Sequence, residues 1–113
     1  MGSLAGKHCV PCHGGVPRLQ GEEIEPLLSQ LEGWRVSEGH HLSKEYEFEN
    51  FADALAFVNR AGEVAEAEGH HPDVEFGWGY VRLKIYTHAI DGLSESDFIL
   101  AARIDAGGDA RRS

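Results

Sequence analysis

Three histidines in the C-terminal half of the chain have the residue type and the spacing for chemistry on one bound ligand. His70 and His71 stand directly before Pro72, and His88 follows Thr87 at the end of the next two strand-like runs. An imidazole has a reference pKa of about 6.5, so it can give or take a proton near neutral pH without help from its surroundings. If the two chain reversals that carry them lie together, the three rings could act as general acids and bases at one site.

Zinc binding is the alternative use of three histidines. Pro72 biases His71 towards an extended conformation, in which adjacent side chains such as those of His70 and His71 point in different directions. The acidic second shell of a zinc site is not evident either. We therefore expect proton transfer at these residues and no metal.

A second group of reactive side chains lies at residues 8–13, His-Cys-Val-Pro-Cys-His. Cys9-x-x-Cys12-His13 has three possible interpretations. It matches the attachment signature of a c-type haem. It could also supply three of the four ligands of a zinc site, or its two thiols could form a redox dithiol. The sequence shows no export signal, no fourth ligand nearby and no thioredoxin-like frame. The remaining interpretation is an arm over residues 1–21 with two reduced thiols, because Gly and Pro occur there without apolar periodicity.

Composition limits the classes of function. The 113 residues suffice for one small domain, and 10 Lys and Arg against 19 Asp and Glu give a formal charge of -9. Direct binding to nucleic acid or to an anionic membrane is therefore not expected. No apolar run approaches the ~20 residues of a spanning helix, and we expect a soluble cytoplasmic protein. Both cysteines fall in the first dozen residues, so packing or self-association must stabilise the fold.

Apolar spacing predicts three helices and two hairpins. The helices are expected over residues 22–31, 51–68 and 94–101, and the hairpins over 34–48 and 74–86. His40 and His41 fall at the first hairpin's turn, where we interpret them as solvated; metal or substrate contact is the alternative.

The middle helix, capped by Asn50 and stopped by Gly69, has an apolar arc wider than one sheet contact requires, which indicates a subunit interface. The tail from 107 to 113 is small and polar and should fray.

Two positions near the last helix have two possible placements each. Strict alternation after Arg82 and Lys84 puts His88 on the polar face of its strand. If the strand ends near Thr87, the ring can instead turn over the end of the sheet towards His70. Asp97 has the spacing of a capping residue after Ser94. It either only caps this helix or also acts on the histidines.

The ordered set of motifs resembles the signature of the pterin-4a-carbinolamine dehydratases. The motifs are Glu-Gly-His-His-Pro at 68–72, the following hairpin, Thr87-His88, and Gly-Leu-Ser-x-x-Asp at 92–97. The resemblance runs from about residue 27 to residue 105 and includes Gly33-Trp34. It implies an α+β fold, a four-stranded antiparallel sheet with three helices on one face, assembled as a homodimer or homotetramer. Residues 22–106 would form this single domain.

The resemblance also implies a reaction and roles for residues. The reaction is dehydration of a 4a-hydroxytetrahydropterin to the quinonoid dihydropterin, the recycling step after an aromatic amino acid hydroxylase, and it requires no cofactor. His70 and His88 would be the acid and base, and His71 would contact the pterin with an auxiliary role in proton transfer. The substrate-binding residues would be Asp97, which orients an imidazole, together with Trp34 and Pro72.

Proteins of this fold can also be binding proteins. One serves as a dimerisation cofactor of a homeodomain transcription factor, and degenerate relatives assist Rubisco assembly. The assembly relatives tend to lose the histidine set, so the presence of His70, His71 and His88 favours the enzyme. A redox or metal module built on Cys9 and Cys12 is a third class.

Overall fold

The computed structural model describes residues 4–6 and 17–112, with side chains up to residue 106. The Cys9-x-x-Cys12-His13 motif lies outside the described residues. The elements, in chain order, are η1 (Leu4–Gly6), α1 (Gly21–Leu28), β1 (Arg35–Ser37), β2 (His41–Glu47), α2 (Phe51–Glu68), β3 (Asp73–Gly77), β4 (Tyr80–Ile85), η2 (His88–Ile90) and α3 (Glu95–Arg112), where η marks a short 3-10 helix.

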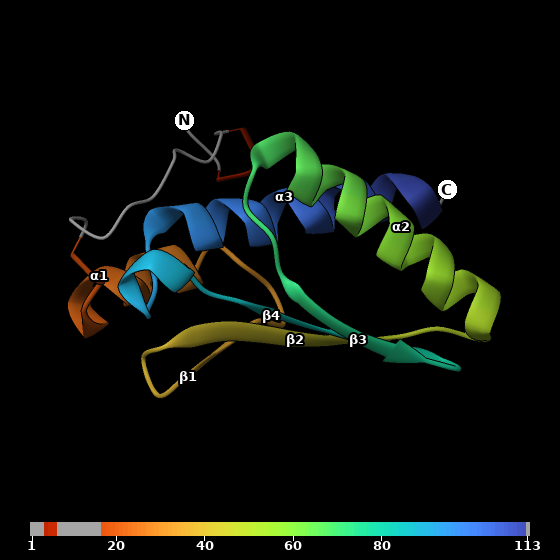
Figure 1. Ribbon diagram of the computed structural model, residues 1–113, viewed down its shortest axis with the longest axis horizontal. Coiled ribbons are helices and arrows are strands. Elements are labelled where there is room, and N and C mark those ends of the chain that lie inside the picture. The colour runs from red at the N-terminus through yellow and green to blue at the C-terminus, as the bar shows by residue number, and fades with distance from the viewer. Residues whose placement is uncertain (1–3, 7–16, 113) are drawn as a thin grey trace.

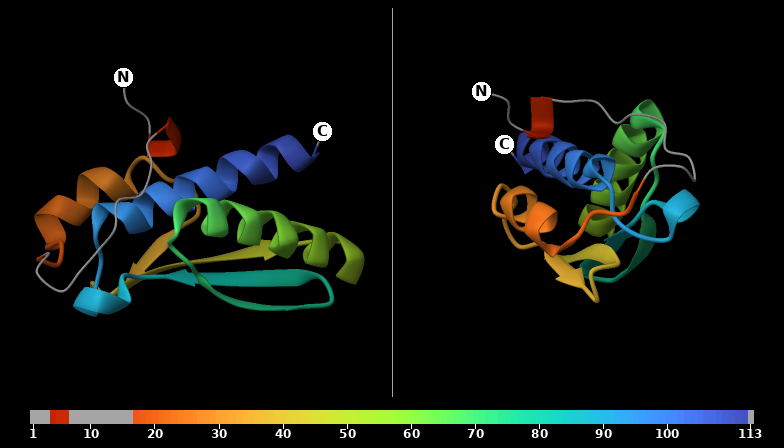
Figure 2. Two further views of the ribbon diagram at one scale, coloured as in Figure 1. Left: turned by 45° about the horizontal axis from the view of Figure 1, so that its top comes forward. Right: turned by 90° about the vertical axis from the view of Figure 1, so that its left-hand side faces the viewer.

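The molecule has two layers, one of sheet and one of helices. The four strands pair antiparallel in the order β1-β2-β4-β3, and α1, α2 and α3 cover one face of the sheet (Figures 1 and 2). The predicted α+β fold, a four-stranded antiparallel sheet with three helices on one face, is confirmed. In the part of the chain that is described, no helix combines the length and the apolar character needed to cross a bilayer.

The core lies between these layers, because the strands and helices each present one apolar face to it. Alternate residues of β2 and β4 point inward, as the period of two for strands requires. Residues of α2 and α3 at helical spacing meet them. The buried apolar side chains of these four elements are Leu42, Ala54, Phe57, Ala61, Ala65, Val81, Leu83, Ile85, Phe98, Ile99, Leu100, Ala101 and Ile104.

The turn between β1 and β2 sets the position of His40. Glu38 and Gly39 both have positive φ, at 55° and 64°, and the His40 N–H donates to the Ser37 carbonyl at 2.9 Å. Two central residues with positive φ make the type I′ turn, whose twist suits a hairpin. His40 therefore leaves the turn just before β2 begins.

Both terminal helices differ in length from the prediction. Helix α1 ends at Leu28 instead of residue 31, because the next residues form tighter bonds, Gln30 N–H to Leu27 O and Leu31 N–H to Leu28 O. Helix α3 runs to Arg112, past the predicted end at residue 101. Ile104 is 1% exposed, so the inward face continues beyond the predicted end.

Parts of the predicted N-terminal arm contact the core. Leu4 is 2% exposed and belongs to the core cluster, and the Arg103 guanidinium donates to the Ala5 carbonyl at 2.9 Å. The Leu19 N–H donates to the Leu93 carbonyl at 2.9 Å. These described stretches pack onto the domain, which differs from the expectation of an arm apart from it.

Candidate active site

A histidine and a buried aspartate form the centre of the candidate site. His70 Nε2 lies 2.5 Å from Asp97 Oδ1. The Asp97 side chain is fully buried, and that of His70 is 13% exposed. A buried carboxylate is costly unless it is paired and hydrogen-bonded. Asp97 is both, which fixes the His70 ring while solvent can still reach it.

The other oxygen of Asp97 ties together the end of the sheet and the start of α3. Asp97 Oδ2 accepts from the Ser94 backbone N–H at 2.8 Å and from the Thr87 hydroxyl at 2.9 Å. The Ser94 and Thr87 hydroxyls lie 2.8 Å apart. Asp97 thus caps the helix with one oxygen and contacts His70 with the other, so it does more than cap the helix. Its role towards a substrate stays a prediction.

The C-terminus of α2 brings His70 to this aspartate. Gly69 has φ 67°, the left-handed conformation predicted for a helix stop, and the His70 N–H donates back to the Ala65 carbonyl at 3.2 Å. This pair of features is the Schellman ending of a helix. Arg103 Nε lies 3.1 Å from Glu68 Oε2, whose side chain is 4% exposed, so the last residue of α2 is paired to α3. Both contacts fix where the chain leaves the helix.

His88 lies beside this cluster but faces outward. Strand β4 ends at Ile85, and His88 opens η2 one residue after Thr87. The exposed His88 ring stacks on Tyr86, with centroids 4.2 Å apart and planes at 12°. This agrees with the placement by strict alternation. No hydrogen bond or ring contact joins His70 to His88 among residues 4–6 and 17–106.

His71 and Pro72 lie on the α2 side of the site. His71 Nε2 lies 2.7 Å from Glu66 Oε2, and both side chains are exposed. A groove of about 770 Å³ runs here between α2 and the start of β3. It is lined by Val58, Asn59, Gly62, Glu63, Ala65, Glu66, His71, Pro72 and Val74. The adjacent rings of His70 and His71 therefore point to different partners, as the proline predicts.

Trp34 makes its polar contact away from the histidines. Its side chain is 6% exposed, and Nε1–H donates to Asp105 Oδ2 at 2.8 Å. Asp105 also accepts from the Tyr46 hydroxyl at 2.6 Å and from Lys44 Nζ at 3.2 Å. These contacts join the residue before β1 to β2 and α3 and explain the burial of the indole. A contact of Trp34 with substrate stays a prediction.

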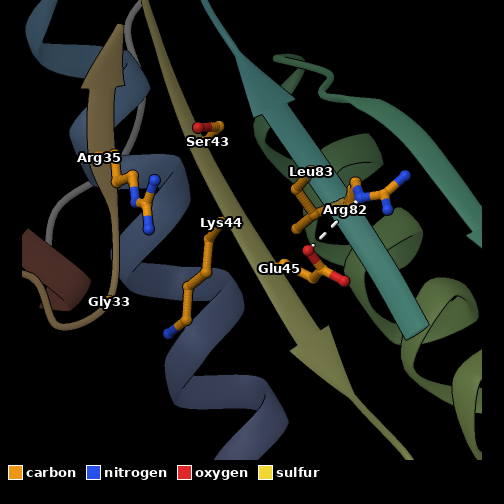
Figure 3. Close-up of a pocket in the computed structure, with 7 residues that line it drawn as sticks. All are labelled: Gly33, Arg35, Ser43, Lys44, Glu45, Arg82 and Leu83. Atoms are coloured by element: carbon orange, nitrogen blue, oxygen red, sulfur yellow. Dashed lines mark hydrogen bonds and ion pairs between the residues drawn. The ribbon is translucent and has the colours of Figure 1, made fainter. Parts of the chain in front are cut away.

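A separate shallow pocket of about 300 Å³ lies on the sheet. It is lined by Gly33, Arg35, Ser43, Lys44, Glu45, Arg82 and Leu83 (Figure 3). The ion pair of Arg82 Nε with Glu45 Oε1, at 3.5 Å, lies within it. The pocket shares no residue with the His70 cluster and is not part of the candidate site.

Two features of the site were not singled out from the sequence. The sequence predicts no contact for the Thr87 side chain, although its buried hydroxyl donates to Asp97. His40 and His41 were expected to be solvated, and both are only partly exposed. The His40 ring lies 2.8 Å from Asp91 Oδ1 through Nε2 and packs on Tyr86. The pairing of a hairpin turn with a loop 51 residues later leaves no local signal in sequence.

The fold and the site together define a small α+β protein with a buried aspartate–imidazole pair and further histidines around one end of its sheet. No group of three or more His, Cys, Asp or Glu suited to holding a metal occurs within the described ranges.

The chain belongs to the pterin 4 alpha carbinolamine dehydratase family, whose sequence model matches residues 17–107. A protein of Rubrobacter xylanophilus named "Putative pterin-4-alpha-carbinolamine dehydratase" is 57% identical over 105 residues, which cover 93% of this chain and 98% of that protein.

Two solved structures resemble this one. A transcriptional coactivator/pterin dehydratase from Brucella melitensis has a TM-score of 0.75 and 28% identity, over 80% of this chain and 98% of that chain. A pterin dehydratase-like protein identified as a RuBisCO assembly factor in the alpha-carboxysome has a TM-score of 0.58 and 29% identity, over 67% of this chain and 89% of that chain.

Proposed function

We propose that this protein dehydrates a 4a-hydroxytetrahydropterin to the quinonoid dihydropterin and water, as a cytoplasmic step of tetrahydropterin recycling. The observation that carries the proposal is the His70–Asp97 pair, an imidazole oriented by a buried carboxylate and still partly exposed. The family to which the chain belongs supports the choice of substrate class.

The reaction needs one proton delivered and one removed. The C4a–O bond breaks, and an acid protonates the departing oxygen to give water. A base takes the proton from N5, and the electron pair of that N–H bond becomes the new C4a=N5 bond. Protons balance, no electrons are gained or lost overall, and two imidazoles suffice as catalysts.

Asp97 determines which ring nitrogen of His70 can exchange a proton with the substrate. A carboxylate only accepts hydrogen bonds, so Nε2 must carry the proton that is shared with Asp97 Oδ1. In the neutral ring Nδ1 is then the free acceptor. We assign the proton exchange of His70 to Nδ1.

We assign the partner role to His88 and an auxiliary role to His71. His88 is exposed and separated from the Asp97 cluster by one peptide bond, through Thr87. His71 Nε2 is paired with Glu66, and within the described residues the other ring nitrogen of His71 makes no hydrogen bond.

The first experiment is stopped-flow decay of freshly generated 4a-hydroxytetrahydropterin with and without the protein. We expect acceleration by the wild type and a loss on the order of 10²-fold or more in His70→Ala and in His88→Ala. His13→Ala, in the N-terminal motif, is the matched histidine control and should keep the wild-type rate. Wild-type turnover in both site variants would refute the assignment.

We further propose that the protein self-associates through the outer face of α2. Phe51 and Leu55 are 45% and 39% exposed there, and Val74 on the edge strand is 42% exposed. Phe51 stacks on Phe76, at 5.4 Å between centroids, which extends the apolar surface from α2 to β3. Sedimentation of the wild type and of Leu55→Glu side by side tests this self-association. A wild type that sediments as a monomer would refute the proposal.

A binding or assembly role is the second candidate. It is favoured by the likeness to a structure described as a RuBisCO assembly factor. A folded protein that leaves carbinolamine decay unchanged at high enzyme concentration would favour this role, whereas acceleration that His70→Ala abolishes would favour the enzyme.

A further inference from the structure

Tyr86, the residue that follows β4, contacts two histidine rings, and we call these three rings the ring column. The centroid of the Tyr86 ring lies 4.2 Å from that of His88, two residues later in the chain, and 4.5 Å from that of His40. The planes of Tyr86 and His88 are nearly parallel, at 12°, whereas His40 is tilted by 42°. Tyr86 is half-buried, His40 comes from the β1–β2 turn, and His88 comes from η2.

The column is the main constraint on the His88 side chain. Within the described residues its imidazole has no hydrogen bond, in contrast to His70 and His71, which each bind a carboxylate. An exposed ring without a polar partner changes rotamer on the ps–ns timescale. A flat contact with a half-buried ring restricts these rotations.

His40 also links the ring column to the backbone of His88. His40 Nε2 lies 2.8 Å from Asp91 Oδ1, and the Asp91 N–H donates to the His88 carbonyl at 3.2 Å. The hydrogen bond from His40, and then its charge, lower the pKa of Asp91, so this carboxylate is ionised near neutral pH. On the other side of η2, Arg18 Nε donates to the Ile90 carbonyl at 2.7 Å. The short helix is thus held from both sides.

We propose that Tyr86 is a positioning residue, which orients the His88 imidazole for proton transfer through the ring column anchored by His40 and Asp91. The inference rests on the proposed dehydratase function for its kinetic consequence. The ring contact itself does not depend on that function.

The test replaces Tyr86 in two ways. Tyr86→Phe keeps the ring and removes the hydroxyl, whereas Tyr86→Leu keeps an apolar side chain and removes the ring. If stacking positions His88, the leucine variant should lose about tenfold or more in kcat, with KM changed less than threefold, because misplaced catalytic groups lower the rate of the chemical step. The phenylalanine variant should stay within about threefold of the wild-type kcat.

A spectroscopic readout separates positioning from a purely structural role. In the wild type, the ring current of Tyr86 should shift the Cε1–H resonance of His88 upfield in a 1H–13C spectrum of the full chain. His88→Gln assigns that resonance. The shift should persist in Tyr86→Phe and disappear in Tyr86→Leu. If Tyr86→Leu does not fold, His40→Gln removes the outer ring and the link to Asp91 and should reduce the same shift.

Each outcome decides the inference. Loss of the shift together with the fall in kcat supports it. Wild-type kcat in a folded leucine variant, an unchanged His88 resonance, or equal losses in the leucine and phenylalanine variants would overturn it. If the wild type itself does not accelerate dehydration, the proposed function fails, while the resonance in the same variants still reports whether Tyr86 orients His88.

Discussion

Replacing Asp97 by asparagine should leave the protein folded and remove most of the proposed dehydratase activity. The side chain is fully buried and accepts three hydrogen bonds, from His70, Thr87 and Ser94. The asparagine carbonyl can take the position of Oδ2 and keep the bonds from Ser94 and Thr87. The amide NH₂ then faces His70 Nε2 and donates to it, which moves the proton of the neutral ring to Nδ1. The nitrogen assigned to proton exchange then already carries a proton and cannot act as the base.

The expected loss in the free energy of unfolding differs between two variants of Asp97. Asp97→Ala leaves two donors without an acceptor, His70 and the Ser94 N–H, since the Thr87 hydroxyl can still bond Ser94. At roughly 1–3 kcal/mol for each buried unsatisfied donor, with His70 partly reachable by water, the loss is roughly 2–4 kcal/mol. Asp97→Asn should lose only about 1–2 kcal/mol, because the cap is retained.

Urea unfolding followed by circular dichroism measures the stability of both variants, and stopped-flow dehydration measures kcat. We expect Asp97→Asn to lose on the order of 10²-fold in kcat, as for removal of a general acid or base. A folded asparagine variant with wild-type kcat would refute the tautomer argument. An asparagine variant as unstable as the alanine variant would show that the cap does not survive the exchange.

Three other outcomes are expected. Burial, and then nearby positive charge, lower the pKa of His41 below 6.5 in the folded protein. The unfolded chain therefore binds this proton at a higher pH than the folded protein, so the free energy of unfolding should fall as pH drops from about 6.5 through the folded pKa. His41→Gln should flatten this part of the curve of unfolding free energy against pH, measured by urea unfolding. An unchanged curve would contradict the assignment of this pH dependence to His41. Trp34→Phe removes one hydrogen bond to Asp105 and should cost about 1 kcal/mol in the same assay, whereas a large rise in KM with unchanged stability would instead favour the predicted substrate contact. Cys9→Ser combined with Cys12→Ser should leave the dehydration rate unchanged, and a large loss would place the N-terminal motif near the reaction.

Local patterns were sufficient for most of the fold. The alternation of β2 and β4, the Asn50 cap and the Gly69 stop each depend on residues within one element, so sequence spacing predicted them correctly. The ends of α1 and α3 were predicted less well. They depend on tertiary packing, such as the burial of Ile104, and on tighter hydrogen bonds after Leu28.

The candidate site likewise has some features that the sequence predicted and others that only the tertiary structure decided. The residue types of His70, His71 and His88, with the capping spacing of Asp97, indicated acid-base chemistry from the sequence alone, because pKa and capping preference belong to residue types and short spacings. Which carboxylate pairs with which imidazole was decided only by tertiary structure. Asp97 meets His70 across 27 positions and Asp91 meets His40 across 51. The first contact follows from how α2 and α3 pack over the sheet, and the second from a hairpin turn that meets the loop after β4. No local pattern encodes either of them.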